Sequence, residues 1–280
     1  MEINFKEWLL AEMPINKFEL LGKWGPNDRP RGYNRQDIGI LTNPKAVDKI
    51  HRQWSNTKQK FDLYFLRAPK AKNYREIGEV SPEWVKENLD IDIQPNPETI
   101  TIIFTQNTGA EKVPMTGWII AHRIGHALYM NRAEGYSNGP LMGFFQKVQR
   151  DFKQMTQRLF GSTPDQYGQY SRYQATPAHL AMAVGTMKSA KDRKLFRFSE
   201  FAHELFAQYL ITGKIKFNPL PRNILMRNHM AWGHHAPQTR WIRDEESYEH
   251  VSNRLEELEY EYEYELDYIL EGLEGSIFVM

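Results

Sequence analysis

Two short segments of the chain carry the residue types of β-strands. Residues 61–69 (FDLYFLRAP) are rich in aromatic side chains and end at a proline, and residues 98–107 (ETITIIFTQN) are rich in β-branched residues. Such runs, bounded by turn-forming residues, predict strands. The stretch 15–44 is instead rich in Gly, Pro, Asn and Asp, and this composition predicts a loop.

Helical spacing of apolar residues prevails in the second half of the chain. Apolar side chains cover most of the circumference of residues 113–135, which predicts a buried helix. In the helix that follows the basic segment SAKDRKLFRF, Ser199 is the expected N-cap and Gly213 the expected end. That helix is thus expected at residues 199–213, and the same spacing predicts further helices at residues 140–160, 177–187 and 245–273.

The last of these segments allows two interpretations. The alternation EYEYEYELDY fits a strand, but the spacing of Leu255, Leu258 and Leu266 favours a helix. Taken together, the elements predict an α+β fold in a single domain, residues 1–280. We expect three parts: a strand-containing N-terminal part (1–113), a helical part (114–244) and an acidic C-terminal helix (245–280).

The composition is that of a globular protein, with 41% hydrophobic and 25% charged residues. There is no apolar run of the ~18 residues that a membrane span needs, and the first residues lack the pattern of a signal peptide. The chain contains no cysteine, which fits the reducing cytoplasm and excludes thiolate ligands. Any metal would therefore be held by His, Asp or Glu.

Charge is unevenly distributed along the chain. The first 254 residues carry all 36 Lys and Arg but 26 of the 35 acids, a net charge of +10, and the last 26 residues carry nine acids and no base. A basic body with an acidic tail is one pattern of nucleic-acid-binding proteins. The alternative, which we favour, is charge balance within the molecule along a solvated helix.

Two histidines four residues apart form the most specific motif, in the segment AHRIGHALYM (121–130). Residues four apart on an α-helix lie one turn apart on one face, with Cβ atoms ~6 Å from each other. His122 and His126 can therefore place two imidazole nitrogens on one metal ion at ~2.1 Å. Gly125 between them allows another segment or a ligand to approach this face closely.

The surrounding pattern resembles a known family. HRIGHAL is similar to the HExGHA helix of zincin metallopeptidases, and SEFAHELFAQYL (199–210) is similar to the glutamate helix of the gluzincins, E-x-F-A-E-x-F-A-x-Y-L. The resemblance covers roughly residues 100–215 and implies a zincin-like core. Residues 185–221 also resemble proteins encoded by tailed phages, which implies a phage origin.

The zincin resemblance implies a zinc site in which His122 and His126 are ligands and a downstream glutamate is the third. One alignment of the glutamate helix puts Glu200 at the ligand position, and an alignment shifted by one turn puts Glu204 there. The two lie on the same helix face, so both are within reach of the metal. We favour Glu200 as the ligand.

Arg123 stands where zincin peptidases have the glutamate that acts as their base. A guanidinium keeps its proton at any working pH, because its pKa is above ~12. Three interpretations follow. In the first, the protein is an inactive relative with a structural metal or none. In the second, another group acts as the base: the member of the Glu200/Glu204 pair that is not a ligand, His203, or a residue of WGHHAP, which contains His234 and His235. In the third, Arg123 clamps the phosphate or carboxylate of an anionic substrate.

The resulting hypothesis is a zincin-like metal-binding protein of the cytoplasm, or of the host cytoplasm for a phage protein. With zinc as its cofactor, it would act as a hydrolase with a non-standard base on a protein or an anionic ligand. One alternative is an inactive scaffold that binds a protein partner, or nucleic acid through the basic body. Another is a structural component of a phage particle. No membrane partner is expected.

Overall fold

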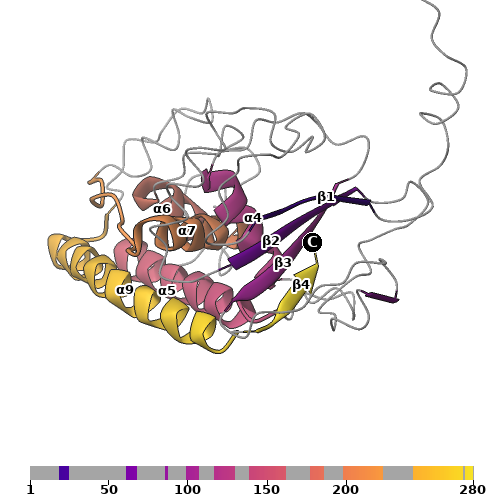
Figure 1. Cartoon of the computed structure of the whole chain (residues 1–280). Helices are drawn as coiled ribbons and strands as arrows, with labels where there is room; N and C mark the ends of the chain where they lie inside the picture. Colours follow the sequence, from indigo (N-terminus) through magenta and orange to yellow (C-terminus); the bar gives the residue numbers. More distant parts are fainter. Residues whose placement is uncertain are drawn as a thin grey trace, which may run out of the picture.

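The computed structural model describes residues 19–24, 61–67, 86–87, 99–106, 117–129, 139–161, 177–185, 198–222, 242–273 and 275–279. The strands in these stretches form one sheet, and the helices pack together beside it (Figure 1). In chain order, the elements are β1 (Glu19–Trp24), β2 (Phe61–Arg67), β3 (Ile100–Gln106), α4 (Gly117–Tyr129), α5 (Met142–Phe160), α6 (Pro177–Val184), α7 (Phe198–Thr212), α9 (Glu245–Glu271) and β4 (Ile277–Val279).

The sheet is mixed, with the described strands in the order β1-β2-β3-β4. β1 pairs antiparallel with β2, whereas β2 with β3 and β3 with β4 are parallel pairs. The two predicted strands, 61–69 and 98–107, are β2 and β3, and both predictions are confirmed. Phe61 lies opposite Ile100, and both side chains are fully buried, which suits the aromatic and β-branched residues of these strands.

β1 and β4 are strands that the sequence pattern does not predict. β1 falls within the predicted loop 15–44, so that prediction is wrong there, whereas β4 follows the predicted helix 245–273 in a stretch with no predicted strand. β4 forms because its segment bonds to β3: the Thr101 N–H donates to the Ser276 carbonyl over 2.8 Å. Gly275, with φ of 73°, turns the chain from helix to sheet in a conformation that glycine tolerates.

The predicted helices correspond to α4 to α7 and α9, and residues 130–135 of the first predicted helix lie outside the described residues. α7 begins at Phe198, so Ser199 lies inside its first turn and the predicted N-cap is wrong. Gly213 follows α7 in the left-handed conformation, with φ of 70°, as predicted. α9 is helical throughout, and its first turn is capped by Asp244, which accepts a hydrogen bond from the Ser247 N–H over 2.6 Å.

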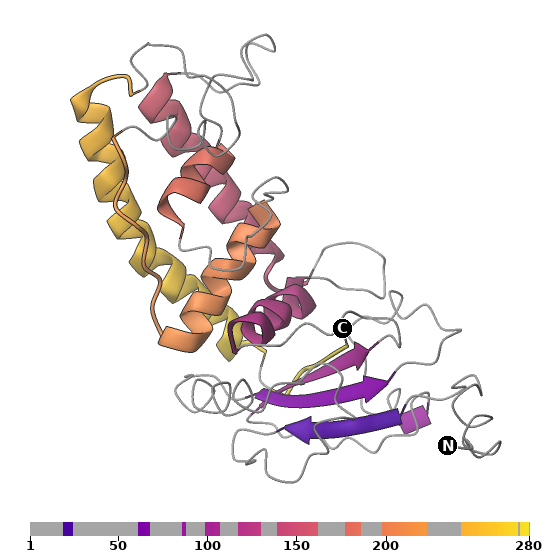
Figure 2. The ribbon, with the colours of Figure 1, turned by 90° about the horizontal axis from the view of Figure 1, so that it is seen from above.

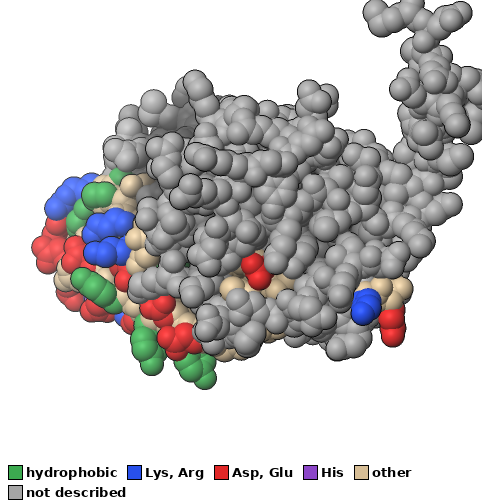
Figure 3. Space-filling model, viewed as in Figure 1, with side chains coloured by type: hydrophobic (Ala, Val, Ile, Leu, Met, Phe, Trp, Pro, Cys, Tyr) green, Lys and Arg blue, Asp and Glu red, His purple; other side chains and the backbone are tan. Residues whose placement is uncertain are grey.

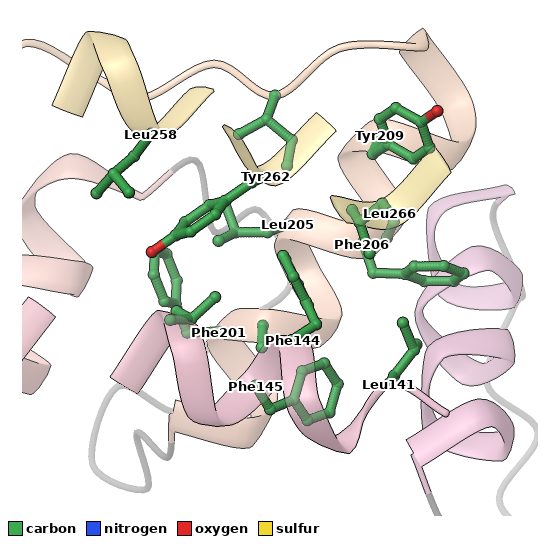
Figure 4. Packing of buried hydrophobic residues seen from close by; sticks show 14 of the residues in the cluster. Leu141, Phe144, Phe145, Phe201, Leu205, Phe206, Tyr209, Leu258, Tyr262 and Leu266 are labelled. Carbon is green, nitrogen blue, oxygen red and sulfur yellow. The ribbon is translucent and has the colours of Figure 1, made fainter. Parts of the chain in front are cut away.

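The helices form a layered core that positions α4 against the sheet. α4 lies between the sheet and the other helices (Figure 2). Side chains from α5, α7 and α9 meet in the core (Figure 4), where Tyr262 of α9 stands edge-on to Phe144 of α5 with ring centroids 5.4 Å apart. The Tyr262 hydroxyl donates to the buried Asp151 carboxylate over 3.1 Å, which links α9 to α5.

Several acids of α9 pair with cations of the same chain. Basic side chains reach them from α5, from the segment after α7 and from α9 itself, and exposed tyrosines lie among the acids on the outer face of α9 (Figure 3). The pairs are Lys147–Glu261 (2.8 Å), Arg158–Glu246 (2.9 Å), Lys216–Glu259 (3.1 Å), Arg222–Glu245 (2.6 Å) and Arg254–Glu261 (2.6 Å). These contacts support charge balance within the molecule, and nucleic-acid binding stays a prediction.

The described part of the chain is thus a mainly helical α+β structure, which agrees with the predicted class. The predicted single domain and its three parts stay predictions. None of the described helices has the length and apolar character needed to cross a membrane.

Candidate metal centre

The contact between α4 and α7 builds the candidate site. α4 contributes His122 and His126 from one face, and α7 contributes Glu200. The two helices approach closely at Gly125, where an added Cβ would lie 3.0 Å from Phe206 Cδ1 and 3.1 Å from His203 Cδ2. The close approach predicted for this glycine is therefore made by side chains of α7.

Three donor atoms of these residues form a small triangle. His126 Nε2 lies 3.0 Å from His122 Nε2, and Glu200 Oε2 lies 3.1 Å from His122 Nε2 and 3.5 Å from His126 Nε2. Ligands at the ~2.0–2.1 Å bond lengths of a tetrahedral zinc site are roughly 3.3 Å apart. The spacing and the donor types, two imidazoles and one carboxylate, therefore fit zinc.

Glu204 lies on the other side of His122. Its Oε1 is 3.2 Å from His122 Nδ1, the nitrogen that faces away from the triangle, although the pair is not aligned as a hydrogen bond. Its Oε2 accepts a hydrogen bond from Trp118 Nε1. The Glu204 side chain is only 4% exposed, whereas that of Glu200 is 40% exposed. Of the two glutamates, the geometry thus favours Glu200 as a ligand and gives Glu204 the position of a carboxylate that orients a ligating histidine.

Trp118 was not predicted as part of the site. It lies one turn before His122 on α4, and the sequence pattern gives it only as one of the apolar residues that cover most of this helix. Its indole N–H is a donor that needs a partner when buried. Trp118 also precedes His122 by four residues, so both lie on one face of the helix, and these two properties are the signal in the sequence that points to its role in the site.

Electrostatics tie the two helices together in the absence of metal. Burial alone would lower the pKa of His122, but Glu200 and Glu204 outweigh this effect and raise the pKa to about 9. Hydrogen bonds from His122 and His126 hold the pKa of Glu200 well below its ordinary value. At neutral pH, the metal-free site is therefore an ion pair between a protonated His122 and an ionised Glu200.

His203 lies beside the triangle, inside the protein. It is 1% exposed and its ring stacks on that of His126, with centroids 3.6 Å apart, while Phe145 stands perpendicular to it at 4.6 Å. Neither ring nitrogen has a hydrogen-bond partner among the described residues. Burial, followed by the neighbouring histidines His126 and His122, lowers the pKa of His203 to about 2, so the ring is neutral at neutral pH.

The remaining predicted site residues are not drawn into the cluster. Arg123 is on α4 and is exposed. His234 and His235 lie outside the described residues. The catalytic roles predicted for Arg123, Glu204 and His203 stay predictions.

The triangle offers an ion the donor atoms of His122, His126 and Glu200, whereas the neighbouring acid Glu204 is already engaged. Glu204 contacts His122 and Trp118, so it does not point freely toward the triangle. The side chains of His126 and Glu200 are partly exposed, at 27% and 40%. No family model, no curated protein and no solved structure matches the chain.

Proposed function

We propose that the chain is a zincin-like zinc-binding protein in which His122, His126 and Glu200 hold one ion between α4 and α7. The observation that carries the proposal is the spacing of their donor atoms, 3.0, 3.1 and 3.5 Å, across two packed helices. The succession of a strand (β3), the histidine helix (α4) and the glutamate helix (α7) is also the order of the zincin resemblance. Glu204 behind His122 adds the supporting carboxylate that such sites use.

The role that we propose for the ion is to tie α4 to α7 in a binding scaffold. Arg123 replaces the peptidase base, and Glu204 is committed to His122 and Trp118. When bound, zinc supplies a cross-link and a Lewis acid. Since His122 and Glu200 are 78 residues apart in the chain, an ion that both hold stabilises the folded state over the unfolded one.

Zinc-dependent thermal unfolding tests this proposal. After removal of metal with a chelator and dialysis, added zinc should stabilise the wild-type protein by about 2.7 kcal/mol when free zinc is 100-fold above its Kd. His122→Ala and His126→Ala should abolish the shift. His250→Ala changes an exposed histidine of α9 and serves as the matched control, with the full shift retained. Equal shifts in all four proteins, or no shift in the wild type, would contradict the proposal.

A second candidate is a zinc-dependent hydrolase with a non-standard base. It is favoured by the partial exposure of His126 and Glu200, which lets water or a substrate approach the ion from that side. The zinc-loaded protein should then cleave unfolded casein or a chromogenic phosphate ester. Turnover that is lost in His122→Ala and retained in His250→Ala would establish a hydrolase. Wild-type turnover no higher than that of His122→Ala would exclude the hydrolase and support the binding scaffold.

A further inference from the structure

His203 is a buried polar group whose surroundings do not satisfy it. The side chain is 1% exposed, and both Nδ1 and Nε2 lack a hydrogen-bond partner among the described residues. Its ring neighbours are the aromatic side chains of His122, His126, Tyr129 and Phe145. Buried histidine nitrogens normally find a partner, and an unpaired one calls for an explanation such as an ion.

The position of His203 gives that explanation. It follows Glu200 by three residues on α7, so both project toward α4 from neighbouring turns. One donor atom from each of His122, His126, Glu200 and His203 can be chosen so that all four lie within 4.8 Å of one another. The ring centroids of His203 and His122 are 5.3 Å apart, not far from the 4.8 Å that separates His122 from His126.

Only a modest rearrangement separates this geometry from tetrahedral coordination. Four ligands of one zinc ion are roughly 3.3 Å apart. Since the four donor atoms lie within 4.8 Å of one another, no distance between two of them has to shorten by more than ~1.5 Å. The movement replaces the stacking of His203 on His126, 3.6 Å between centroids, by a shared ion. Gly125 has no side chain to obstruct the His203 ring, whose Cδ2 lies 3.1 Å from the position of a Cβ there.

We propose that His203 is the fourth protein ligand, so that His122, His126, Glu200 and His203 enclose the ion in a closed, structural zinc site. The inference rests on the proposed zinc binding and specifies the kind of site. Four protein ligands leave no position for water or substrate, which is the arrangement of structural rather than catalytic zinc. It also accounts for a helix that keeps both histidines of its motif and has Arg123 in place of the base.

Cobalt substitution distinguishes a closed site from an open one. Co²⁺ bound in place of Zn²⁺ reports its coordination through its visible absorption, and azide changes the spectrum when it replaces a bound water. The wild-type spectrum should be tetrahedral and unaffected by azide. His203→Phe keeps an aromatic ring against His126 and removes both nitrogens, so its cobalt spectrum should respond to azide and its zinc affinity should fall at least tenfold.

The stability of the metal-free His203→Phe variant provides a second test. His203→Phe should be at least as stable as the wild type without metal, because it removes two unpaired nitrogens and keeps the packing. A wild-type cobalt spectrum that responds to azide overturns the closed site, and so does unchanged zinc affinity in His203→Phe. The wild-type measurement decides the question even if the variant does not fold. Absence of cobalt and zinc binding in the wild type would instead overturn the proposed function itself.

Discussion

Replacing Glu204 by glutamine tests the division of roles between the two glutamates of α7. The side chain is 4% exposed, with one oxygen 3.2 Å from His122 Nδ1 and the other accepting the Trp118 indole N–H. Glutamine keeps the length and shape but loses the charge. One of its two polar atoms becomes an NH₂ donor, which then faces either the Nδ1–H of His122 or the N–H of Trp118.

Glu204→Gln should weaken zinc binding, because it removes the carboxylate that supports the ligand His122. Removing such a partner typically weakens metal binding by about 10–100-fold, or about 1.4–2.7 kcal/mol. Glu200→Gln should weaken binding far more, because it removes a ligand from the triangle. If Glu204 were the ligand, the order of the two variants would be reversed.

Competition against a chromophoric zinc chelator at fixed pH measures these affinities. Glu257→Gln is the matched control, since Glu257 is an exposed acid of α9 that pairs with Arg254, and its zinc affinity should equal that of the wild type. Circular dichroism of the metal-free proteins checks that all variants are folded. Zinc affinity of Glu204→Gln within twofold of the wild type, in a folded protein, would refute the supporting role.

Three further predictions concern proton release, helix packing and α9. Because the metal-free His122 has a pKa of about 9 and must be neutral to bind zinc, binding at pH 7 should release about one proton and tighten with rising pH up to about 9. Calorimetry of zinc binding in buffers of different ionisation enthalpy measures this proton release, and identical heats in all buffers would contradict it. Since folding raises the pKa of His122, the metal-free protein should also lose stability as the pH rises from 6.5 to 9. Gly125→Ala should destabilise the protein by about 1–3 kcal/mol, because the added Cβ would lie 3.0 Å from Phe206 and 3.1 Å from His203. Gly143→Ala on α5 is the control, since its Cβ would meet no atom within 4 Å and should not destabilise the protein. Equal midpoints of urea unfolding for the two variants would contradict this prediction. Glu259→Ala should lower the free energy of unfolding by about 1–3 kcal/mol, because the Phe217 N–H, which donates to Glu259 over 2.7 Å, would lose its acceptor. A free energy of urea unfolding within about 0.3 kcal/mol of the wild type would contradict this prediction.

The sequence allows the helices and the histidine pair to be predicted because both depend on local periodicity. His122 and His126 share a face of any helix that contains them. For α9, the spacing of Leu255, Leu258 and Leu266 favours a helix over the strand alternative, and these residues are buried with Tyr262 in the structure. Local patterns of this kind do not require knowledge of the partner segment.

Other features depend on contacts between distant segments and leave little trace in the sequence. β4 is a strand because it bonds to β3, about 175 residues earlier in the chain. Glu200 and Glu204 lie on one face of α7, so the choice between them depends on how α7 is rotated against α4. The contacts of Trp118 and the stacking of His203 on His126 depend on that same packing.

Zinc content is the most direct measure of the central claim that α4 and α7 together hold a metal. Wild-type protein that has been exposed to zinc and then dialysed without chelator should contain about one equivalent by elemental analysis, as should His250→Ala. The double variant His122→Ala/His126→Ala should contain less than about 0.1 equivalent while keeping its helical circular dichroism. Less than about 0.1 equivalent in the folded wild type, or equal content in the wild type and the double variant, would contradict the account.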